Sequence, residues 1–500
     1  METFSFPTKN KKTILALGAE SAGNFSVYCP APYNQKEAGV HFPLPCNQGR
    51  AGEGFRAMND TIHFSQDFGD LLDEANFTRF KKSVLAFLKK ENLTPDIILT
   101  DLHPLMKTTL WGKALARKYK AGHIQVQHHH AHIFSSVGEC LTSSPVFKQR
   151  LGCIAPSPVL RGGLGRGYGA DGQRKIPHTF YGIAMDGTGY GEDEKIWGGE
   201  CFAISNFQFP ISNQFSNSND KISKQKICVQ RIGHLENQIM IGGELAIREP
   251  ARMLIAILNK VFSASSPSPV LREGVSTYSS GRRGWERERN TAQQKKDLIY
   301  PFIKKYYTRN EFGLLHNQLE QNFNCAETSS AGRVLDAVSL LLGFCGNERK
   351  YKHAPIELLE KNSTTPYKDL EPKIARDANG QYILDTSYLF NYVINYLHKK
   401  DKRRLAATAQ LYIAEGLHEI IQKHCPLPCT QGRAGEGLRE VCNIFFSGGL
   451  ANNRIISDYL ISQGAYTNEK VYPVNSNEFN GVPRGDAGLS FGQVIYYLFS

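Results

Sequence analysis

Four histidines, at positions 128, 129, 130 and 132, stand within five residues of this 500-residue chain. A β-type run over residues 124–127 precedes them, and an apolar pattern with a helical period follows. His128 and His132 are four positions apart, so on a helix they share one face, one turn apart. Two imidazoles with this spacing can bind one metal ion. The spacing therefore predicts His128 and His132 as ligands, with His129 and His130 in packing or second-sphere roles.

The strongest glycine-rich string, Asp186 to Gly189 and onward, follows an apolar strand expected at residues 181–185. Gly187 and Gly189 allow backbone N–H groups to turn toward an anion, and the Thr188 hydroxyl adds a donor. Asp186, at the end of the strand, is placed to face a metal ion and its phosphates. An ordinary β-hairpin with an Asp-Gly turn is the alternative.

Two further glycine-rich turns precede expected helices. Gly448 and Gly449 lie between an apolar strand and a helix that begins near Asn453, and such a junction offers free N–H groups to an anion. Asn453 is alternatively a helix cap. Asp486 lies in the third turn, where it is either an N-cap or a metal carboxylate.

Apolar runs alternate with helical periods over most of the chain, which predicts the α/β class. Asp336 lies one turn into one expected helix, after two serines and a glycine, and simple helix initiation would explain this pattern as well. The strands are expected at residues 13–17, 96–100, 122–127, 181–185 and 443–446. The helices are expected at 71–90, 104–120, 331–344, 403–423, 453–463 and 487–499.

Length and composition predict a globular protein of two or more domains, with 41% hydrophobic residues. No stretch approaches the roughly 18 continuous apolar residues of a membrane span. Residues 1–12 contain no apolar signal-peptide core, so the cytoplasm is the expected compartment. The eleven cysteines are then expected to be reduced thiols.

The formal charge of +12 would suit an anionic partner such as nucleic acid. Its distribution argues against that interpretation. Residues 145–178 hold six Lys or Arg against one Asp, a net of +5, and residues 262–296 hold seven against three Glu, a net of +4. The basic excess therefore lies mainly in two loop-like segments, and binding of nucleic acid is not expected.

Short strings rich in Gly, Pro and Arg recur at unrelated positions. Residues 43–54 recur as 426–437 with only Asn47 replaced by Thr430, and residues 157–161 recur as 268–272. These strings share no hydrophobic face that could stack, unlike solenoid repeats. We interpret them as insertions in disordered surface loops, near 30–58, 145–178, 262–296 and 425–440.

The glycine-rich turns and acidic residues suggest a nucleotide bound in a cleft between two lobes, and the chain has no GxxxxGK[ST] P-loop. Taken together, the motifs resemble the C-terminal Kae/TsaD-like part of the HypF-type carbamoyltransferases of hydrogenase maturation. The resemblance is carried, in order along the chain, by residues 15–20, 101–104, 127–132, 186–191 with 197–200, 242–252, 329–338, 447–453 and 486–493.

The resemblance implies two actin-like (RNase H-like) lobes around an ATP cleft, here expected at residues 12–200 and 201–500. It implies transfer of a carbamoyl group from carbamoyl adenylate to the C-terminal cysteine of a HypE-like partner. It implies a divalent ion, zinc or iron with Mg²⁺ as a further candidate, bound by His128, His132, Asp186 and Asp486, of which the first three are catalytic. It implies nucleotide contacts at Gly187, Thr188, Gly189, Asp336, Gly448, Gly449 and Asn453.

Full-length members of the resembled family carry an acylphosphatase domain, zinc-finger repeats and a YrdC-like domain before this part. The sequence begins almost directly at the transferase motifs, so we expect a separate YrdC-like protein to supply the adenylate. Three other functions stay open. They are O-carbamoylation of a small molecule, threonylcarbamoyl transfer to tRNA, and a nucleotide-binding relic without activity.

Overall fold

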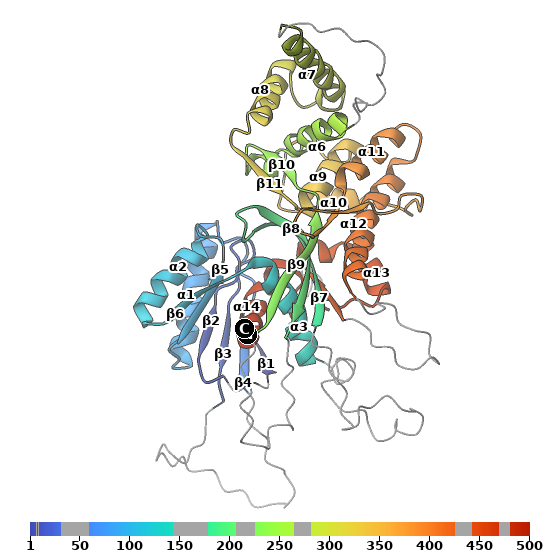
Figure 1. Ribbon diagram of the computed structural model, residues 1–500. Helices are drawn as coiled ribbons and strands as arrows, with labels where there is room; N and C mark the ends of the chain where they lie inside the picture. Colours follow the sequence, from blue (N-terminus) through green and yellow to red (C-terminus); the bar gives the residue numbers. More distant parts are fainter. Residues whose placement is uncertain are drawn as a thin grey trace, which may run out of the picture. The chain divides into compact units, whose positions relative to one another are not determined.

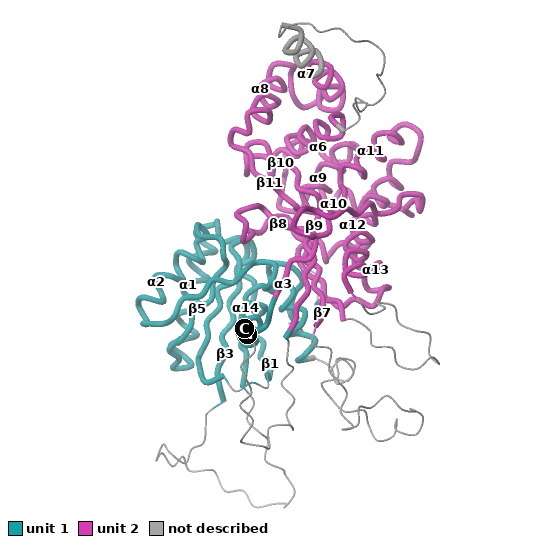
Figure 2. The backbone as a smooth tube through the Cα atoms, viewed as in Figure 1, with its two compact units in different colours: residues 1–178, 206–228, 468–500 teal, residues 179–205, 229–467 magenta. Residues whose placement is uncertain are grey.

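The chain forms two compact units, each built from segments far apart in the sequence (Figure 2). Unit 1 comprises residues 1–178, 206–228 and 468–500, and unit 2 comprises 179–205 and 229–467. The computed structural model describes residues 1–31 except 7 and 9, 60–143, 179–206, 226–264, 282–425, 443–469 and 481–500, with only the backbone of 282–292. The predicted lobes divide the chain once, near residue 200, whereas these units interleave. The assignment of two actin-like lobes to those two ranges stays a prediction.

Unit 1 contains a six-stranded sheet in the order β1-β4-β3-β2-β5-β6 (Figure 1). The first four strands pair antiparallel, whereas β2, β5 and β6 are parallel. The carboxyl ends of these parallel strands therefore lie at one edge of the sheet, where ligands commonly bind in α/β proteins. The strands are β1 (Glu2–Phe6), β2 (Ile14–Ala16), β3 (Ser26–Cys29), β4 (Asp60–Phe64), β5 (Ile97–Asp101) and β6 (Gly122–Val126).

Helices cover both faces of the unit 1 sheet because its strands are apolar on both sides. Leu15 and Val27 pack with α1 (Glu74–Lys90) and α2 (Lys107–Tyr119) in one buried cluster. Ser26 faces the other side, where its hydroxyl lies 2.9 Å from that of Ser490 in α14 (Leu489–Phe499). Helix α14 packs along α3 (His128–Ser143), and the short 3₁₀ helix η4 (Gly485–Gly488) leads into it.

Unit 2 contains an eight-stranded mixed sheet. One path runs β10-β11-β8-β9-β13-β12, and β7 lies between β8 and β14. Strands β7 and β14 are parallel, so their carboxyl ends meet at one edge. The strands are β7 (Thr179–Tyr190), β8 (Ile196–Ser205), β9 (Cys228–Leu235), β10 (Gln238–Ile241), β11 (Cys325–Thr328), β12 (Ile374–Arg376), β13 (Tyr382–Leu384) and β14 (Ile444–Ser447).

The core of unit 2 centres on α9 (Ala331–Leu342), all twelve residues of which are buried. A helix buried on every side must be apolar around most of its circumference, which explains the run of Val, Leu and Ala in α9. The other helices are α5 (Leu245–Arg248), α6 (Pro250–Ala264), α7 (Arg282–Ile303), α8 (Arg309–Glu320), α10 (Ala354–Lys361), α11 (Thr386–Tyr396), α12 (Lys402–His424), η3 (Gly449–Asn452) and α13 (Arg454–Ser462).

The α/β class is confirmed, and each strand and helix expected from the sequence is present within a few residues. The expected helix at 487–499 is preceded by the separate 3₁₀ turn η4. The expected insertions lie largely outside the described residues. The insertion near 262–296 was predicted to be disordered over its whole length. This prediction is wrong for residues 282–296, which belong to helix α7.

Candidate functional site

Helix α3 begins at His128 because the Gln127 side chain caps it. The Gln127 Oε1 atom accepts hydrogen bonds from the backbone N–H groups of His129 (2.6 Å) and His130 (3.0 Å). His128 and His132 consequently lie one turn apart on the same face, and both are buried. Their Nε2 atoms are 3.1 Å apart. The predicted convergence of the outer histidines is confirmed.

Asp486 joins these two histidines within unit 1. Its Oδ1 atom lies 3.4 Å from the Nε2 atom of His128 and 3.3 Å from that of His132. The Ser21 hydroxyl donates to the other carboxylate oxygen and so fixes the orientation of the carboxylate. Asp486 makes no side-chain cap at η4 or α14, so its interpretation as an N-cap is wrong.

The three side chains of unit 1 fit a metal ion. Tetrahedral ligands at about 2.0–2.1 Å from a zinc ion lie roughly 3.3 Å from one another. The three donor atoms of His128, His132 and Asp486 are separated by 3.1, 3.3 and 3.4 Å. Two imidazoles and a carboxylate suit zinc or iron. Asp186, the fourth predicted ligand, belongs to unit 2, and its part in the metal site stays a prediction.

Asp101 is a site residue that the sequence reasoning did not select. It ends β5, is fully buried, and its Oδ2 atom lies 2.6 Å from the Nδ1 atom of His128. A carboxylate at Nδ1 holds the proton there and leaves the Nε2 lone pair available to a metal ion. Asp101 ends β5, which is parallel to β6, the strand that leads into the histidines. Its place at the end of an expected strand was the feature of the sequence that could have indicated a role in the site.

We expect Asp101→Asn to weaken metal binding by about 10–100-fold while the fold is retained. The amide keeps an acceptor for the backbone N–H of His103, which Asp101 Oδ1 binds at 2.8 Å. Its NH₂ group would instead face the Nδ1 atom of His128 and favour the tautomer with the proton on Nε2. Titration with Zn²⁺ against a chelator of known affinity measures the change. An unchanged affinity would exclude this role for Asp101.

The two inner histidines do not converge with the outer pair. His130 is buried and stacks on Tyr496 of α14, with ring centroids 5.6 Å apart and planes at 29°. Burial lowers the pKa of His130 to about 4, so its ring is neutral at pH 7. The Nδ1 atom of His129 lies 3.2 Å from the Gln127 amide. These contacts agree with the packing and second-sphere roles expected for both residues.

The glycine-rich string of unit 2 lies inside a strand and not in a turn. Strand β7 continues to Tyr190, with an irregularity in its pairing with β8 between Met185 and Gly189. The chain reverses later, where the backbone N–H of Gly191 bonds to the carbonyl of Lys195 at 2.9 Å. The Asp-Gly hairpin is therefore wrong. A bulge of this kind redirects the backbone groups of the string away from the ladder.

The N-terminus of α9 holds this string in place. The Ser330 hydroxyl, which caps α9, donates to the carbonyls of Asp186 (3.2 Å) and Gly187 (2.5 Å). A Cβ on Gly332 would lie 2.9 Å from the Cα of Gly187, and one on Gly198 would lie 2.5 Å from the Asp186 carbonyl oxygen. Helix α9 at Gly332 and strand β8 at Gly198 can approach the string this closely only because both positions are glycine.

Gly448 and Gly449 adjoin Asp186 within unit 2. Gly448 has φ +108°, and a Cβ there would lie 2.1 Å from the Met185 carbonyl oxygen, so only glycine fits. The backbone N–H of Gly449 points at Asp186 Oδ1 at 3.3 Å. Two of the segments predicted to bind a nucleotide therefore lie side by side in unit 2.

Asn453 caps α13, as its alternative interpretation proposed. Its Oδ1 atom accepts from the backbone N–H of Ile456 at 3.2 Å, and its amide donates to Gln410 (2.7 Å) and Glu360 (3.2 Å). The Asn453 side chain therefore makes all three of these hydrogen bonds to neighbouring residues of unit 2. The predicted contact of Asn453 with a nucleotide stays a prediction.

Asp336 is buried between two arginines. Its Oδ2 atom accepts from Arg333 Nη2 at 3.0 Å and from Arg349 Nη2. Burial raises the pKa of the Asp336 carboxyl above its ordinary value, although both guanidinium groups oppose this shift. The Oδ1 atom has no hydrogen-bond partner among the described residues. Its predicted contact with a ribose stays a prediction.

Comparison with known families decides which family this arrangement belongs to. A family model described as "Carbamoyltransferase, Kae1-like Domain, second subdomain" matches residues 182–218 and 222–493, which is more than half of the chain. The chain belongs to the HypF carbamoyltransferase family. A second model, described as "HypF Kae1-like domain", matches residues 55–139. The two matches together include Asp101, His128, His132, Asp186 and Asp486.

Curated relatives agree with this assignment. The chain is 28% identical over 445 residues to "Probable carbamoyltransferase HypF" of Methanocaldococcus jannaschii, a match that covers 88% of this chain and 44% of that protein. It is 27% identical over 297 residues to "Carbamoyltransferase HypF homolog" of Cupriavidus necator, which covers 59% of this chain and 54% of that protein. The chain therefore spans about half the length of these HypF relatives.

Two solved HypF structures share the fold over 99% of this chain. One is titled "Crystal structure of full-length HypF in the phosphate- and nucleotide-bound form", with TM-score 0.64, 19% identity and 57% of that chain covered. The other is HypF of T. kodakarensis, with TM-score 0.63, 22% identity and 49% covered. These matches and the two family models confirm the predicted α/β fold of the Kae-like part of HypF.

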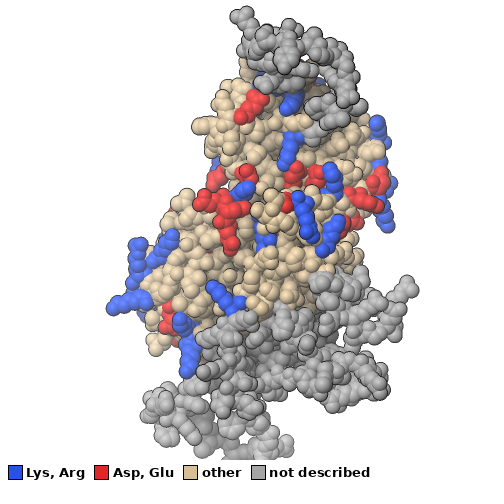
Figure 3. Space-filling model, in the orientation of Figure 1, with Lys and Arg blue, Asp and Glu red and all other residues tan. Residues whose placement is uncertain are grey.

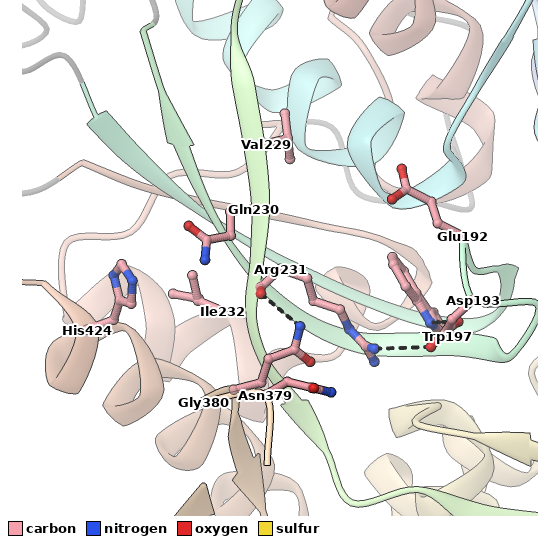
Figure 4. Close-up of a pocket in the computed structure, with 11 residues that line it drawn as sticks. Glu192, Asp193, Trp197, Val229, Gln230, Arg231, Ile232, Asn379, Gly380 and His424 are labelled. Carbon is pink, nitrogen blue, oxygen red and sulfur yellow. Dashed lines mark hydrogen bonds and ion pairs between the residues drawn. The ribbon is translucent and has the colours of Figure 1, made fainter. Parts of the chain in front are cut away.

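Trp197, the first residue of the WGGE string 197–200, lines a cavity of about 590 Å³ in unit 2 together with Asp193 and Arg231 (Figure 4). The Arg231 guanidinium lies 4.2 Å from the centroid of the Trp197 ring, and Trp197 Nε1 donates to Asp193 at 2.7 Å. Behind them, fully buried Glu200 accepts from Arg231 Nε at 2.6 Å. From the sequence alone, this string indicates only the family resemblance. The structure shows that Glu200 fixes Arg231 against Trp197.

The charges on one face of the described residues give no support to the tRNA alternative. On the face drawn in Figure 3, the Lys and Arg side chains of the described residues lie in small groups among acidic and uncharged ones, without a continuous basic stripe. In the part of the chain that the structure describes, no helix is long and apolar enough to cross a bilayer.

Proposed function

We propose that this HypF-family chain transfers the carbamoyl group of carbamoyl adenylate to the C-terminal cysteine thiolate of a HypE-type protein. The observation that supports it best is the convergence of His128, His132 and Asp486 in unit 1, in a chain that the HypF models match over both units. The hydrogen bond between the Gly449 N–H and Asp186 in unit 2, which brings the two glycine-rich segments together, supports the proposed binding of the nucleotide there.

The reaction needs no covalent enzyme intermediate. The thiolate of the acceptor attacks the carbamoyl carbon, an S–C bond forms, the C–O bond to the phosphate breaks, and AMP leaves with the electron pair. A metal ion bound by His128, His132 and Asp486 would polarise the carbamoyl carbonyl as a Lewis acid. A separate YrdC-like protein is part of the proposal, because the adenylate must be formed before this step.

Two cysteines of unit 2, Cys201 and Cys345, are poorly suited to act as a nucleophile within the chain itself. Burial raises the pKa of Cys345 to about 11 and the pKa of Cys201 well above its ordinary value. Neither side chain is therefore a thiolate at neutral pH. The attacking thiol is better supplied by the acceptor.

A transfer assay with three different acceptors of the carbamoyl group distinguishes this proposal from its alternatives. The chain is supplied with carbamoyl adenylate, generated by a YrdC-like protein from labelled carbamoyl phosphate and ATP. The label should appear on a HypE-type C-terminal peptide and not on the same peptide with Ser in place of the last Cys. Label on a small-molecule hydroxyl only would favour O-carbamoylation instead. A modified tRNA would favour the tRNA alternative.

A further inference from the structure

Arg333 has more hydrogen-bond donors than the described part of unit 2 satisfies. It lies in the first turn of α9, and its side chain is 4% exposed. Its Nη2 atom pairs with Asp336, whereas its Nε and Nη1 atoms are buried without a hydrogen-bond partner among the described residues. A buried donor left unpaired costs about 1–3 kcal/mol, and more on a charged group. A bound group that supplies acceptor oxygens would remove this cost.

The charges around Arg333 favour an anion as that group. Arg333 and Arg349 share the single oxygen Oδ2 of Asp336. Arg349 is otherwise satisfied, because its Nε and Nη1 atoms donate to the carbonyls of Ile247 and Lys352. The two guanidinium groups therefore share the buried carboxylate of Asp336, and the carboxylate of Asp186 also stabilises the charge of Arg333 electrostatically. The unpaired N–H donors of a buried cation are best satisfied by the acceptor oxygens of an anion.

The position of Arg333 identifies the class of anion. Its Nη2 atom lies 3.4 Å from the position that a Cβ of Gly187 would occupy, so the guanidinium rests against the glycine-rich string. The capping residue of the same helix, Ser330, holds the carbonyl of Gly187 at 2.5 Å. Arginine and the first turn of a helix are both favourable partners of phosphate groups.

We propose that Arg333 binds a phosphate group of the nucleotide held by the glycine-rich string 187–189. The inference rests on the proposed function, which requires an adenylate at this string. The Nε and Nη1 atoms of Arg333 donate to the phosphate oxygens, while the bond to Asp336 keeps the guanidinium in place. Arg333 then orients the carbamoyl adenylate, from which AMP leaves with this phosphate group.

Calorimetric titration of the full chain with ATP and with adenosine tests this role. Arg333→Lys keeps the charge but loses donors, so its ATP affinity should fall by at least about tenfold, as expected for a charged hydrogen bond. Its adenosine affinity should stay unchanged. An equal loss for both ligands, or no loss for ATP, would overturn the inference. If the unaltered chain binds neither ligand, the proposed function itself fails.

Arg349→Lys is the matched control, because Arg349 touches the same carboxylate and each of its three nitrogen atoms already bonds to an acceptor. It should change the affinities for ATP and adenosine by the same factor. If Arg333→Lys does not fold, pyrophosphate replaces the variant as the probe. Pyrophosphate should compete with ATP and not with adenosine for the unaltered chain. Failure to compete with ATP would contradict a phosphate site at Arg333.

Discussion

Replacing His128 or His132 with Ala should lower the affinity for zinc or ferrous iron by more than about 100-fold. Each change removes one of the three donor atoms that lie 3.1–3.4 Å apart in unit 1. Loss of a ligand removes a metal–nitrogen bond outright, so the effect should exceed the 10–100-fold loss that follows removal of a second-sphere partner. Metal content after dialysis and competition with a chelator measure the effect.

His130→Ala is the matched control for these variants. His130 is buried on the same helix, but its ring stacks on Tyr496 and does not face Asp486. The substitution should therefore lower the stability of the α3–α14 contact and leave metal affinity within a few-fold of the original. Equal losses of metal affinity in all three histidine variants would contradict the assignment of the outer pair as ligands.

Gly492→Ala should destabilise unit 1 by about 3 kcal/mol or more, because it forces an overpacked contact between α3 and α14. A Cβ at Gly492 would lie 1.8 Å from the carbonyl oxygen of Ala131, which is helix backbone and cannot rotate away. The thermal unfolding midpoint should fall by roughly 6–12 °C for a unit of this size. Metal affinity should fall too, since α14 follows the turn that bears Asp486.

Gly313→Ala provides the comparison for this prediction. Gly313 lies inside α8, and nothing lies within 4 Å of its Cβ position. Alanine is the better helix former there, so the change should stabilise the protein by about 0.5–1 kcal/mol. A Gly492→Ala protein that melts at or above the temperature of the original would contradict the prediction. It would show that α3 and α14 can move apart without loss of stability.

The sequence predicted those parts of the site that depend on local spacing. His128 and His132 could be paired because a helix puts positions four apart on one face. Gly448 could be selected because a strand-to-helix turn commonly needs a glycine. For Asp486 the sequence left two roles open, a helix N-cap and a metal ligand. Only the distances of 3.3–3.4 Å from its carboxylate to the two imidazoles favour the second role.

Contacts between distant segments could not be predicted in this way. Asp101 meets His128 because β5 and β6 are parallel neighbours, which is a property of the sheet order and not of the local sequence. Glu200 and Arg231 meet through the pairing of separate strands, and neither has a local signal. The alternative interpretation, an Asp-Gly turn at Asp186 and Gly187, was wrong because an irregularity in the pairing with β8 allows β7 to continue past Gly187 and Gly189.

Transfer by the purified chain in a single turnover tests the central claim most directly. Carbamoyl adenylate from a YrdC-like protein is mixed with a HypE-type peptide and with either the unaltered chain or His132→Ala, and the terminal cysteine is analysed by mass spectrometry. The proposal predicts an S-carbamoyl cysteine with the unaltered chain and at least about a hundredfold less with the variant. An unmodified cysteine despite bound ATP, or equal transfer by both proteins, would contradict it.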